Sequence, residues 1–154
     1  MNNNDILRRI RYTFDINDAT MIEIFALTNM EVSRAEISNW LKKDDDPYFE
    51  KLTDIPLSHF LNGFIIYKRG RKEGEQPIPE KRLNNNIIFR KLRIALNLQD
   101  EGILAILANV DFTISKHELS AFFRNPTQSQ YRVCHDQILR NFIYGLQNTY
   151  KIDK

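Results

Sequence analysis

The chain contains an internal tandem repeat, which constrains its fold more than any other feature of the sequence. Shifting the sequence by 82 residues aligns residues 3–72 with residues 85–154 without a gap. Of the 70 aligned pairs, 16 are identical. Three of these pairs are Asn4/Asn86, Ser33/Ser115 and Gly63/Gly145. Identity spread over the whole length predicts two copies of one structural unit.

The repeat also sets the expected domain boundaries. We expect a first helical repeat at residues 3–70, a linker at residues 71–84 and a second helical repeat at residues 85–154. The linker segment is charged and contains Gly and Pro, which favours an exposed connection. Each copy alone is near the lower size limit for an independent core. We therefore expect the two halves to pack together with pseudo-two-fold symmetry.

Each copy shows the spacing of apolar residues that is typical of α-helices, and no segment alternates with the period of a strand. The predicted fold class is therefore all-α, with roughly four helices in each copy. The clearest helix starts are two capping boxes, in which a Ser is followed three residues later by a Glu. These are Ser33 with Glu36 and Ser115 with Glu118.

Further signals predict where the other helices begin and end. Asp18, Asp100 and Asp54 are predicted to be N-caps, and Asp46-Pro47 predicts a short additional helix. Gly70 is predicted to end the last helix of the first copy. Gly63 and Gly145 lie in the middle of predicted helices, where Gly is costly, so they indicate a close approach between helices.

Composition and charge narrow the class of protein. The 154 residues carry a net charge of +2 and only one Cys, which excludes a disulfide framework and a thiolate metal cluster. The N-terminus lacks the features of a signal peptide, and no apolar run approaches the roughly 20 residues that a membrane span needs. We therefore expect a cytoplasmic protein without membrane contact.

One group of motifs resembles a known family. The stretch from Asp18 to Trp40, the following LKKDDDP sequence, and the later FLNG and KRG sequences are similar to those of the YehS-like bacterial family. This is a family of uncharacterised cytoplasmic proteins with a duplicated domain of unknown function. The resemblance covers essentially the whole chain. It implies an all-helical duplicated architecture and no established activity.

The sequence shows no motif for catalysis, metal binding or a cofactor. Cys134 and His135 are adjacent, so on a helix their side chains would point apart instead of pairing as nucleophile and base. Asp44-Asp45-Asp46 lacks the Gly and Glu that an EF-hand requires. There is no phosphate-binding loop and no dinucleotide fingerprint. We predict a non-enzymatic protein without metal or cofactor.

The leading functional hypothesis is nucleic-acid binding through two helix-turn-helix-like motifs. The predicted turns are the four residues 29–32 and their copy 111–114. Each following helix would present a cation, a hydroxyl and a second cation at i, i+4 and i+8, which suits phosphate contacts. The alternative is a solvated helix face. The candidate residues are Arg34, Ser38 and Lys42 in the first copy, and Lys116, Ser120 and Arg124 in the second.

A second duplicated set of cations consists of arginines in the first helix of each copy. They are Arg8, Arg11, Arg90 and Arg93. We interpret them as structural clamps that pair with Asp18 and Asp100 or with helix C-terminal carbonyls. An anion site is the alternative interpretation.

The two halves differ in charge. Residues 1–77 contain 11 basic and 13 acidic residues, which gives −2, and residues 78–154 contain 11 basic and 7 acidic residues, which gives +4. The second half is the better candidate for a polyanion partner.

The rival hypothesis is a protein adaptor with an apolar groove between the repeats. Its anchors would be aromatic residues such as Tyr48, Tyr67, Tyr131 and Tyr150. The sequence identifies no individual partner.

Overall fold

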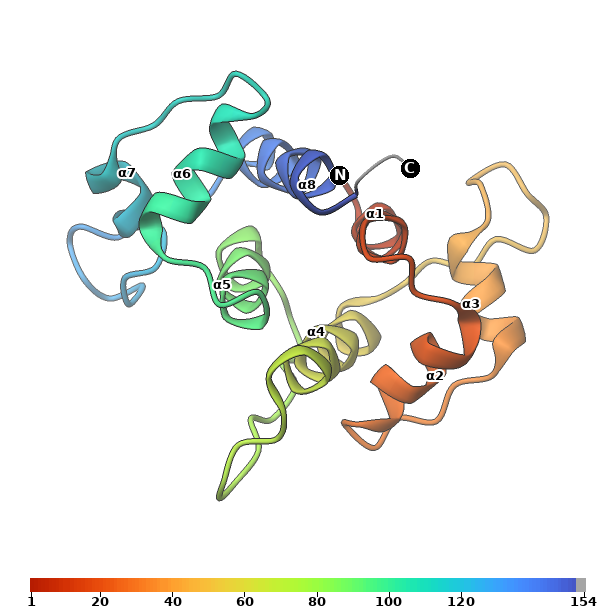
Figure 1. Cartoon of the computed structure of the whole chain (residues 1–154). Coiled ribbons are helices and arrows are strands. Elements are labelled where there is room, and N and C mark those ends of the chain that lie inside the picture. The colour runs from red at the N-terminus through yellow and green to blue at the C-terminus, as the bar shows by residue number, and fades with distance from the viewer. Residues whose placement is uncertain (152–154) are drawn as a thin grey trace. The chain divides into compact units, whose positions relative to one another are not determined.

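The computed structural model describes residues 1–151, and over this range it contains eight helices and no strands (Figure 1). This confirms the predicted all-α class and the duplicated unit of four helices. In the first copy the helices are α1 (Asn3–Thr13), α2 (Asp18–Ala26), α3 (Arg34–Leu41) and α4 (Asp54–Arg69). In the second they are α5 (Asn85–Ala95), α6 (Asp100–Ala108), α7 (Lys116–Ala121) and α8 (Asp136–Tyr150).

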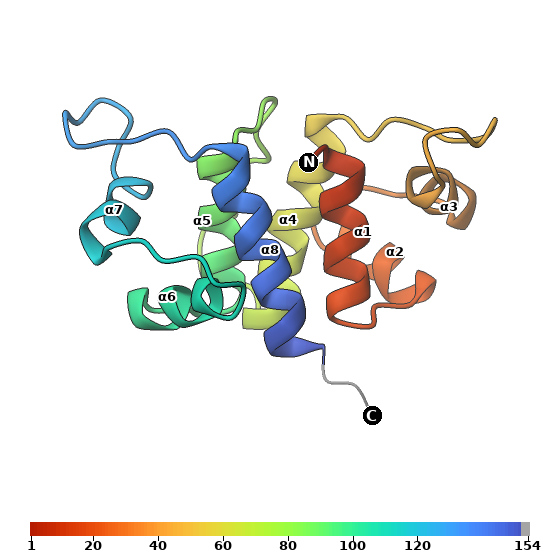
Figure 2. The ribbon, with the colours of Figure 1, turned by 90° about the horizontal axis from the view of Figure 1, so that it is seen from above.

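The chain forms two compact units, Met1–Leu83 and Asn84–Lys154. In the first unit, α2 packs against α3 and α4, and α1 packs against α3 and α4. In the second unit, α6 packs against α7 and α8, and α5 packs against α8. An extended segment joins the third helix of each unit to the fourth, as Figure 2 shows after α3 and after α7.

The two capping boxes form as predicted. The Ser33 hydroxyl accepts the Glu36 N–H at 3.1 Å, and the Glu36 carboxylate accepts the Ser33 N–H at 3.0 Å. The equivalent distances for Ser115 and Glu118 are 3.0 and 3.2 Å. Each box satisfies backbone donors that the first helical turn leaves without an intrahelical partner.

The three predicted aspartate caps are displaced by one residue. Asp18, Asp100 and Asp54 are the first residues of α2, α6 and α4, and the N-cap positions belong to Asn17, Gln99 and Thr53. The Asn17 side chain accepts the Thr20 N–H at 2.9 Å. A carboxylate in the first turn still interacts favourably with the helix dipole, which leaves the aspartates available for ion pairs.

The helix predicted at Asp46-Pro47 does not form. Residues 43–49 make turns instead, and the Asp46 carboxylate accepts the Tyr48 N–H at 2.8 Å. This local bond offers the backbone an alternative to helical hydrogen bonding, which explains why the prediction was wrong.

Two turns in each unit use a left-handed residue, and the sequence reasoning missed them. Asp15 and Asn97, which are equivalent in the repeat, have φ of 51° and 53°. Asn29 and Asp111, also equivalent, have φ of 63° and 56°. Asn and Asp tolerate this conformation better than other non-glycine residues. The repeat therefore preserves the backbone conformation while exchanging one permissive residue for the other.

In each core, one central aromatic ring contacts two other rings at equivalent positions. The central ring comes from α2 in the first unit and from α5 in the second. In the first unit, Phe25 of α2 lies 5.6 Å from Trp40 and 5.5 Å from Phe60, measured between ring centroids. In the second unit, Phe89 of α5 contacts the equivalent rings at 6.3 and 4.5 Å. Those equivalent rings are Phe122 and Phe142. The residue equivalent to Phe25 is Leu107, and the residue equivalent to Phe89 is Leu7, so the large and small side chains have changed places.

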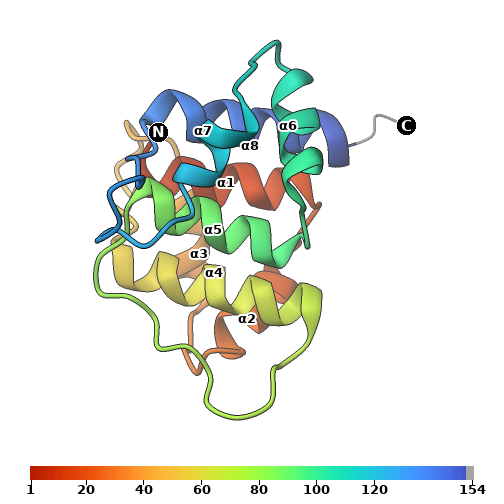
Figure 3. The same cartoon turned by 90° about the vertical axis from the view of Figure 1, so that its left-hand side faces the viewer.

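The segment predicted as an exposed linker makes hydrogen bonds to the first unit. Most of its side chains are exposed, as expected, but the segment belongs to the compact unit Met1–Leu83. The Glu80 N–H donates to the Ser58 hydroxyl at 2.8 Å, and the Leu83 N–H donates to the Asp54 carboxylate at 3.0 Å. Figure 3 shows this segment running back beside α4.

Candidate functional site

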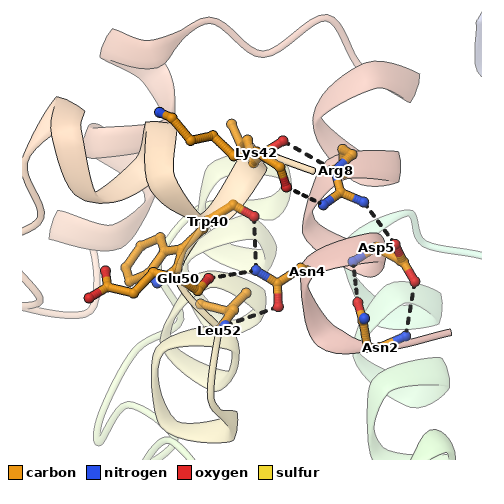
Figure 4. Close-up of polar contacts among 9 residues, drawn as sticks. Asn2, Asn4, Asp5, Arg8, Trp40, Lys42, Glu50 and Leu52 are labelled. Atoms are coloured by element: carbon orange, nitrogen blue, oxygen red, sulfur yellow. Dashed lines mark hydrogen bonds and ion pairs between the residues drawn. The ribbon is translucent and has the colours of Figure 1, made fainter. Parts of the chain in front are cut away.

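A buried asparagine holds the end of α3, the helix that carries the predicted cations of the first copy. Asn4 of α1 is 1% exposed, and its amide nitrogen donates to the carbonyls of Trp40 at 2.8 Å and Glu50 at 2.9 Å. Its amide oxygen accepts the Leu52 N–H at 3.0 Å (Figure 4). Both N–H donors of the amide group are therefore used. Asn4 ties the end of α3 to the extended segment that leads to α4.

The second unit repeats this network bond for bond. Asn86 donates to the carbonyls of Phe122 at 3.1 Å and Arg132 at 2.8 Å, and it accepts the Cys134 N–H at 2.9 Å. Every partner lies 82 residues after its counterpart. The identity of Asn4 and Asn86 in the repeat was the available signal, but the sequence does not show which backbone groups they reach.

A neighbouring pair of asparagines fixes the start of the fourth helix in each unit. Asn3 donates to the Leu52 carbonyl at 3.1 Å and to the Asp54 carboxylate at 2.8 Å. Asn85 does the same with Cys134 at 3.0 Å and Asp136 at 2.7 Å. The hydrogen bond from Asn85 lowers the pKa of the Asp136 carboxyl below its ordinary value. The segments that follow α3 and α7 are thus held at both ends by Asn3, Asn4, Asn85 and Asn86.

Arg8 adds a clamp in the first unit. Its Nε donates to the Leu41 carbonyl at 3.3 Å, and its Nη2 donates to the Lys42 carbonyl at 3.0 Å (Figure 4). Its Nη1 pairs with Asp5 at 2.8 Å. The guanidinium group thereby satisfies carbonyls at the end of α3, where the helix leaves them without intrahelical partners.

The equivalent arginine of the second unit, Arg90, is exposed and makes no hydrogen bond or ion pair with any described residue. The residue equivalent to Asp5 is Ile87, which removes one of the partners available to Arg8. The clamp at the end of the third helix is therefore a feature of the first unit.

The other two arginines join the first helix of each unit to the second. Arg11 pairs with Asp18, and Arg93 pairs with Asp100 at 3.0 Å. The Arg93 guanidinium also lies over the Phe123 ring, 4.7 Å from its centroid. Both ion pairs are partly buried, and each draws the start of its helix, α2 or α6, against the preceding helix.

In the first copy, Arg34 and Ser38 are exposed on α3, and Lys42 is half-buried at the end of the helix. Arg34 is 68% exposed and pairs loosely with Asp18 at 3.4 Å. Lys42 donates to the Ser38 hydroxyl at 2.9 Å and to the Asn39 side chain at 3.2 Å. Lys42 is the C-cap of α3, so the three residues extend from the first turn of the helix to its end.

The second-copy cations do not all lie on one helix. Lys116 is 64% exposed and pairs with Glu101 at 2.9 Å, and the Ser120 hydroxyl donates to the His117 carbonyl at 3.0 Å. Because α7 ends at Ala121, Arg124 lies beyond it. The expected spacing along one helical face is therefore wrong for this copy. The Nε of Arg124 is buried and has no hydrogen-bond partner among the described residues.

The connections between helices are longer than the predicted helix-turn-helix. Residues 27–33 join α2 to α3, and residues 109–115 join α6 to α7, so each connection has seven residues instead of four. Turns of roughly 3–4 residues are typical of the motif. The pairs of helices therefore lack its proportions.

The remaining candidate groups have structural surroundings. Burial raises the pKa of the Cys134 thiol to about 12, so the thiol stays protonated at neutral pH and is a poor nucleophile there. Within residues 1–151, no group of three or more His, Cys, Asp or Glu side chains is placed to hold a metal ion. In the same range, no helix combines the length and the apolar character needed to cross a membrane.

The aromatic candidates for a protein partner differ in exposure. Tyr48 is 71% exposed, in the turn after α3, and Tyr67 and Tyr150 are also exposed near the ends of α4 and α8. Tyr131 is half-buried in the segment after α7.

Comparison with known proteins places the chain in a family. The model of the family described as "Protein of unknown function (DUF1456)" matches twice, at residues 3–70 and 85–151. The Uncharacterized protein YehS of Escherichia coli (strain K12) is 45% identical over 147 residues, which is 95% of this chain and 94% of YehS. No solved structure matches the chain. Since the family model matches both repeats and YehS shares nearly the whole length, this chain belongs to the DUF1456 family.

Proposed function

We propose that this protein is a non-enzymatic cytoplasmic binding protein whose ligand is nucleic acid, contacted mainly by the second unit. The observation that carries the proposal is the difference in charge between two equivalent segments. Residues 42–53, which follow α3, contain three Lys and four acidic residues, whereas residues 124–135, which follow α7, contain two Arg and no acidic residue.

The two segments share one backbone frame, because Asn4 and Asn86 make the same three hydrogen bonds to them. The second segment presents Arg132 and several amide and hydroxyl side chains to solvent. Nucleic-acid backbones are bound by this combination of cations and neutral hydrogen-bonding groups.

Lys116 extends the cationic surface at the start of α7. Its ion pair with Glu101 is exposed, and exposed pairs contribute little to stability. A phosphate group can therefore replace the Glu101 carboxylate at low cost. The hydrogen bond to Glu101 raises the pKa of Lys116, so the ammonium group is charged across the physiological range.

The test is a binding titration of the intact protein with labelled duplex DNA, single-stranded DNA and single-stranded RNA at several salt concentrations. We expect binding that weakens as salt rises, because each phosphate contact releases a condensed counterion. Lys116→Glu with Arg132→Glu should abolish it. Lys81→Glu with Arg82→Glu makes the same change of net charge at exposed positions of the segment beside α4 and serves as the control.

A specific interface predicts that the control variant retains most of the affinity. Equal loss in both double variants would show non-specific attraction and contradict the proposal. No detectable binding to any of the three nucleic acids at about 50 mM salt would also contradict it. Arg34→Glu, in the first unit, should weaken binding less than Lys116→Glu, because acidic residues surround the first segment.

A further inference from the structure

The first unit contains a pocket that the nucleic-acid proposal does not use. Its volume is about 280 Å³, and it lies among the end of α2, the second half of α4 and the segment that follows α4. Apolar walls come from Leu27, Ile65, Ile66 and Ile78. A volume near 300 Å³ is at the small end of the range for ligand pockets.

The charged residues that line this pocket are all cationic. They are Arg71 and Lys72, and none of the described lining residues is acidic. The Arg71 guanidinium donates to the Leu27 carbonyl at 3.1 Å, which holds it beside the apolar wall. A guanidinium group has five N–H donors, so this bond leaves donors for an anionic ligand.

The wall formed by the segment after α4 is fixed at several points. Gly70 turns the chain at φ 81°, and Gln76 donates to the Lys72 carbonyl at 2.7 Å within the segment. The Ser58–Glu80 hydrogen bonds then attach the end of the segment to α4. The pocket is therefore formed before a ligand arrives, which reduces the ordering that binding requires.

The lining has changed from apolar to polar between the two copies, whereas the core positions stay apolar and the asparagine network is the same in both. Three apolar residues of the wall are replaced by polar residues at the equivalent positions of the second copy. The pairs are Leu27/Asn109, Ile65/Gln147 and Ile66/Asn148. The packing of the repeat does not require apolar side chains at these positions, so a role particular to the first copy explains them.

We propose that this pocket binds a small molecule with an apolar chain and an anionic head group, in the class of medium-chain carboxylates. The chain would lie against Ile65 and Ile66, and the head group would meet Arg71 and Lys72. The pocket volume, at the small end of the range for ligand sites, suits a short chain such as that of octanoate.

The experiment uses octanoate as the probe and follows the backbone amides of the intact protein by ¹H–¹⁵N correlation spectroscopy. We expect saturable shifts confined to residues around the pocket, including Ile66, Gly70 and Ile78. Octylamine has the same chain with a cationic head group, and it should not produce these shifts at equal concentration.

Two variants test the recognition groups. Arg71→Gln with Lys72→Gln should weaken octanoate binding about tenfold, the loss expected for a charge-assisted hydrogen bond. Lys81→Gln with Arg82→Gln removes the same charge from the same segment without touching the pocket, and it should bind as the native protein does. Ile78→Glu, at a largely exposed wall position, should abolish binding by adding a repelling carboxylate.

Three outcomes would overturn the proposal. They are shifts scattered over both units, equal effects of octanoate and octylamine, and equal weakening in the two glutamine variants. Retention of the nucleic-acid affinity in Arg71→Gln with Lys72→Gln would show that the two proposed sites are separate.

Discussion

Gly63 of α4 lies directly against the backbone carbonyl of Ile24 in α2, so a Cβ atom at position 63 would overlap the carbonyl oxygen. Gly145 of α8 has the same relationship to Ile106 in α6. The repeat thus preserves one close helix–helix contact in each unit. Since the obstructing atoms belong to the backbone, they cannot move aside as a flexible side chain can.

Gly63→Ala should therefore destabilise the first unit by about 2 kcal/mol, although Ala is the better helix former, because overpacking outweighs propensity. Fluorescence of Trp40 during urea denaturation would report the first unit. Gly102→Ala in α6 of the second unit is the control, followed by circular dichroism, since its Cβ would meet only a side-chain carbon of Leu98 at 3.6 Å. It should be neutral or stabilising by up to about 1 kcal/mol.

The exchanged core residues predict a compensating double substitution. Leu7→Phe should overpack the first core, and Phe25→Leu should leave a void, each at about 1–3 kcal/mol. The two together reproduce the arrangement of Phe89 and Leu107 in the second unit. A double-mutant cycle measured by urea denaturation should show that the pair costs clearly less than the sum of its members. If the losses in the free energy of unfolding simply added, the proposed compensation between positions 7 and 25 would be contradicted.

Removal of the Asn4 amide should destabilise the first unit strongly. Asn4→Leu leaves the Trp40 and Glu50 carbonyls and the Leu52 N–H without this partner, at a cost of about 3 kcal/mol. Asn86→Leu should be equally costly in the second unit, measured by circular dichroism. Asn109→Leu removes one exposed bond to Thr149 and should change stability by less than about 0.5 kcal/mol.

The arginines of α5 provide a matched pair for the clamp interpretation. Arg93→Gln loses the Asp100 ion pair and the contact with the Phe123 ring, and it should lower the free energy of unfolding by about 1 kcal/mol. Arg90→Gln changes the charge equally on the same helix at an exposed position, so thermal unfolding should barely shift. Similar shifts in both variants would indicate a general charge effect.

The buried Cys134 thiol should make the free energy of unfolding fall as the pH rises. Burial raises the thiol pKa from 9.0 to about 12, so the folded state holds its proton after the unfolded state has lost it. The contribution of this thiol to stability is full below pH 9 and is lost as the pH rises through 12. Cys134→Ala should reduce the slope of stability against pH between about 9 and 12. An unchanged slope would contradict the buried, protonated thiol.

Thiol modification gives an independent measurement of the same environment. At pH 8, Cys134 of the native protein should react slowly with a disulfide reagent, and it should react rapidly after denaturation in urea. Rapid reaction of the native protein would show that the thiol is accessible.

Features with a local cause were predictable from the sequence. The helical class follows from the spacing of apolar residues, and the capping boxes at Ser33 and Ser115 form because each involves residues only three apart. The duplication predicted that Gly63 and Gly145 share a role. Where two local signals competed, the sequence was ambiguous: Asp18 follows Asn17, which has the N-cap role, and Asp46 bonds to Tyr48 in place of starting a helix.

Only the tertiary structure decided which distant groups meet. Asn4 bonds to residues 36 to 48 positions away, and no spacing rule relates an amide to backbone atoms so distant in sequence. Tertiary packing also decided that the first core has its large ring at Phe25 and not at Leu7. It likewise formed the pocket that the segment after α4 closes. The sequence specifies periodicity and caps because these depend on neighbours within one or two helical turns. The site depends on how separate helices pack, and that is settled by the burial of side chains contributed by all of them at once.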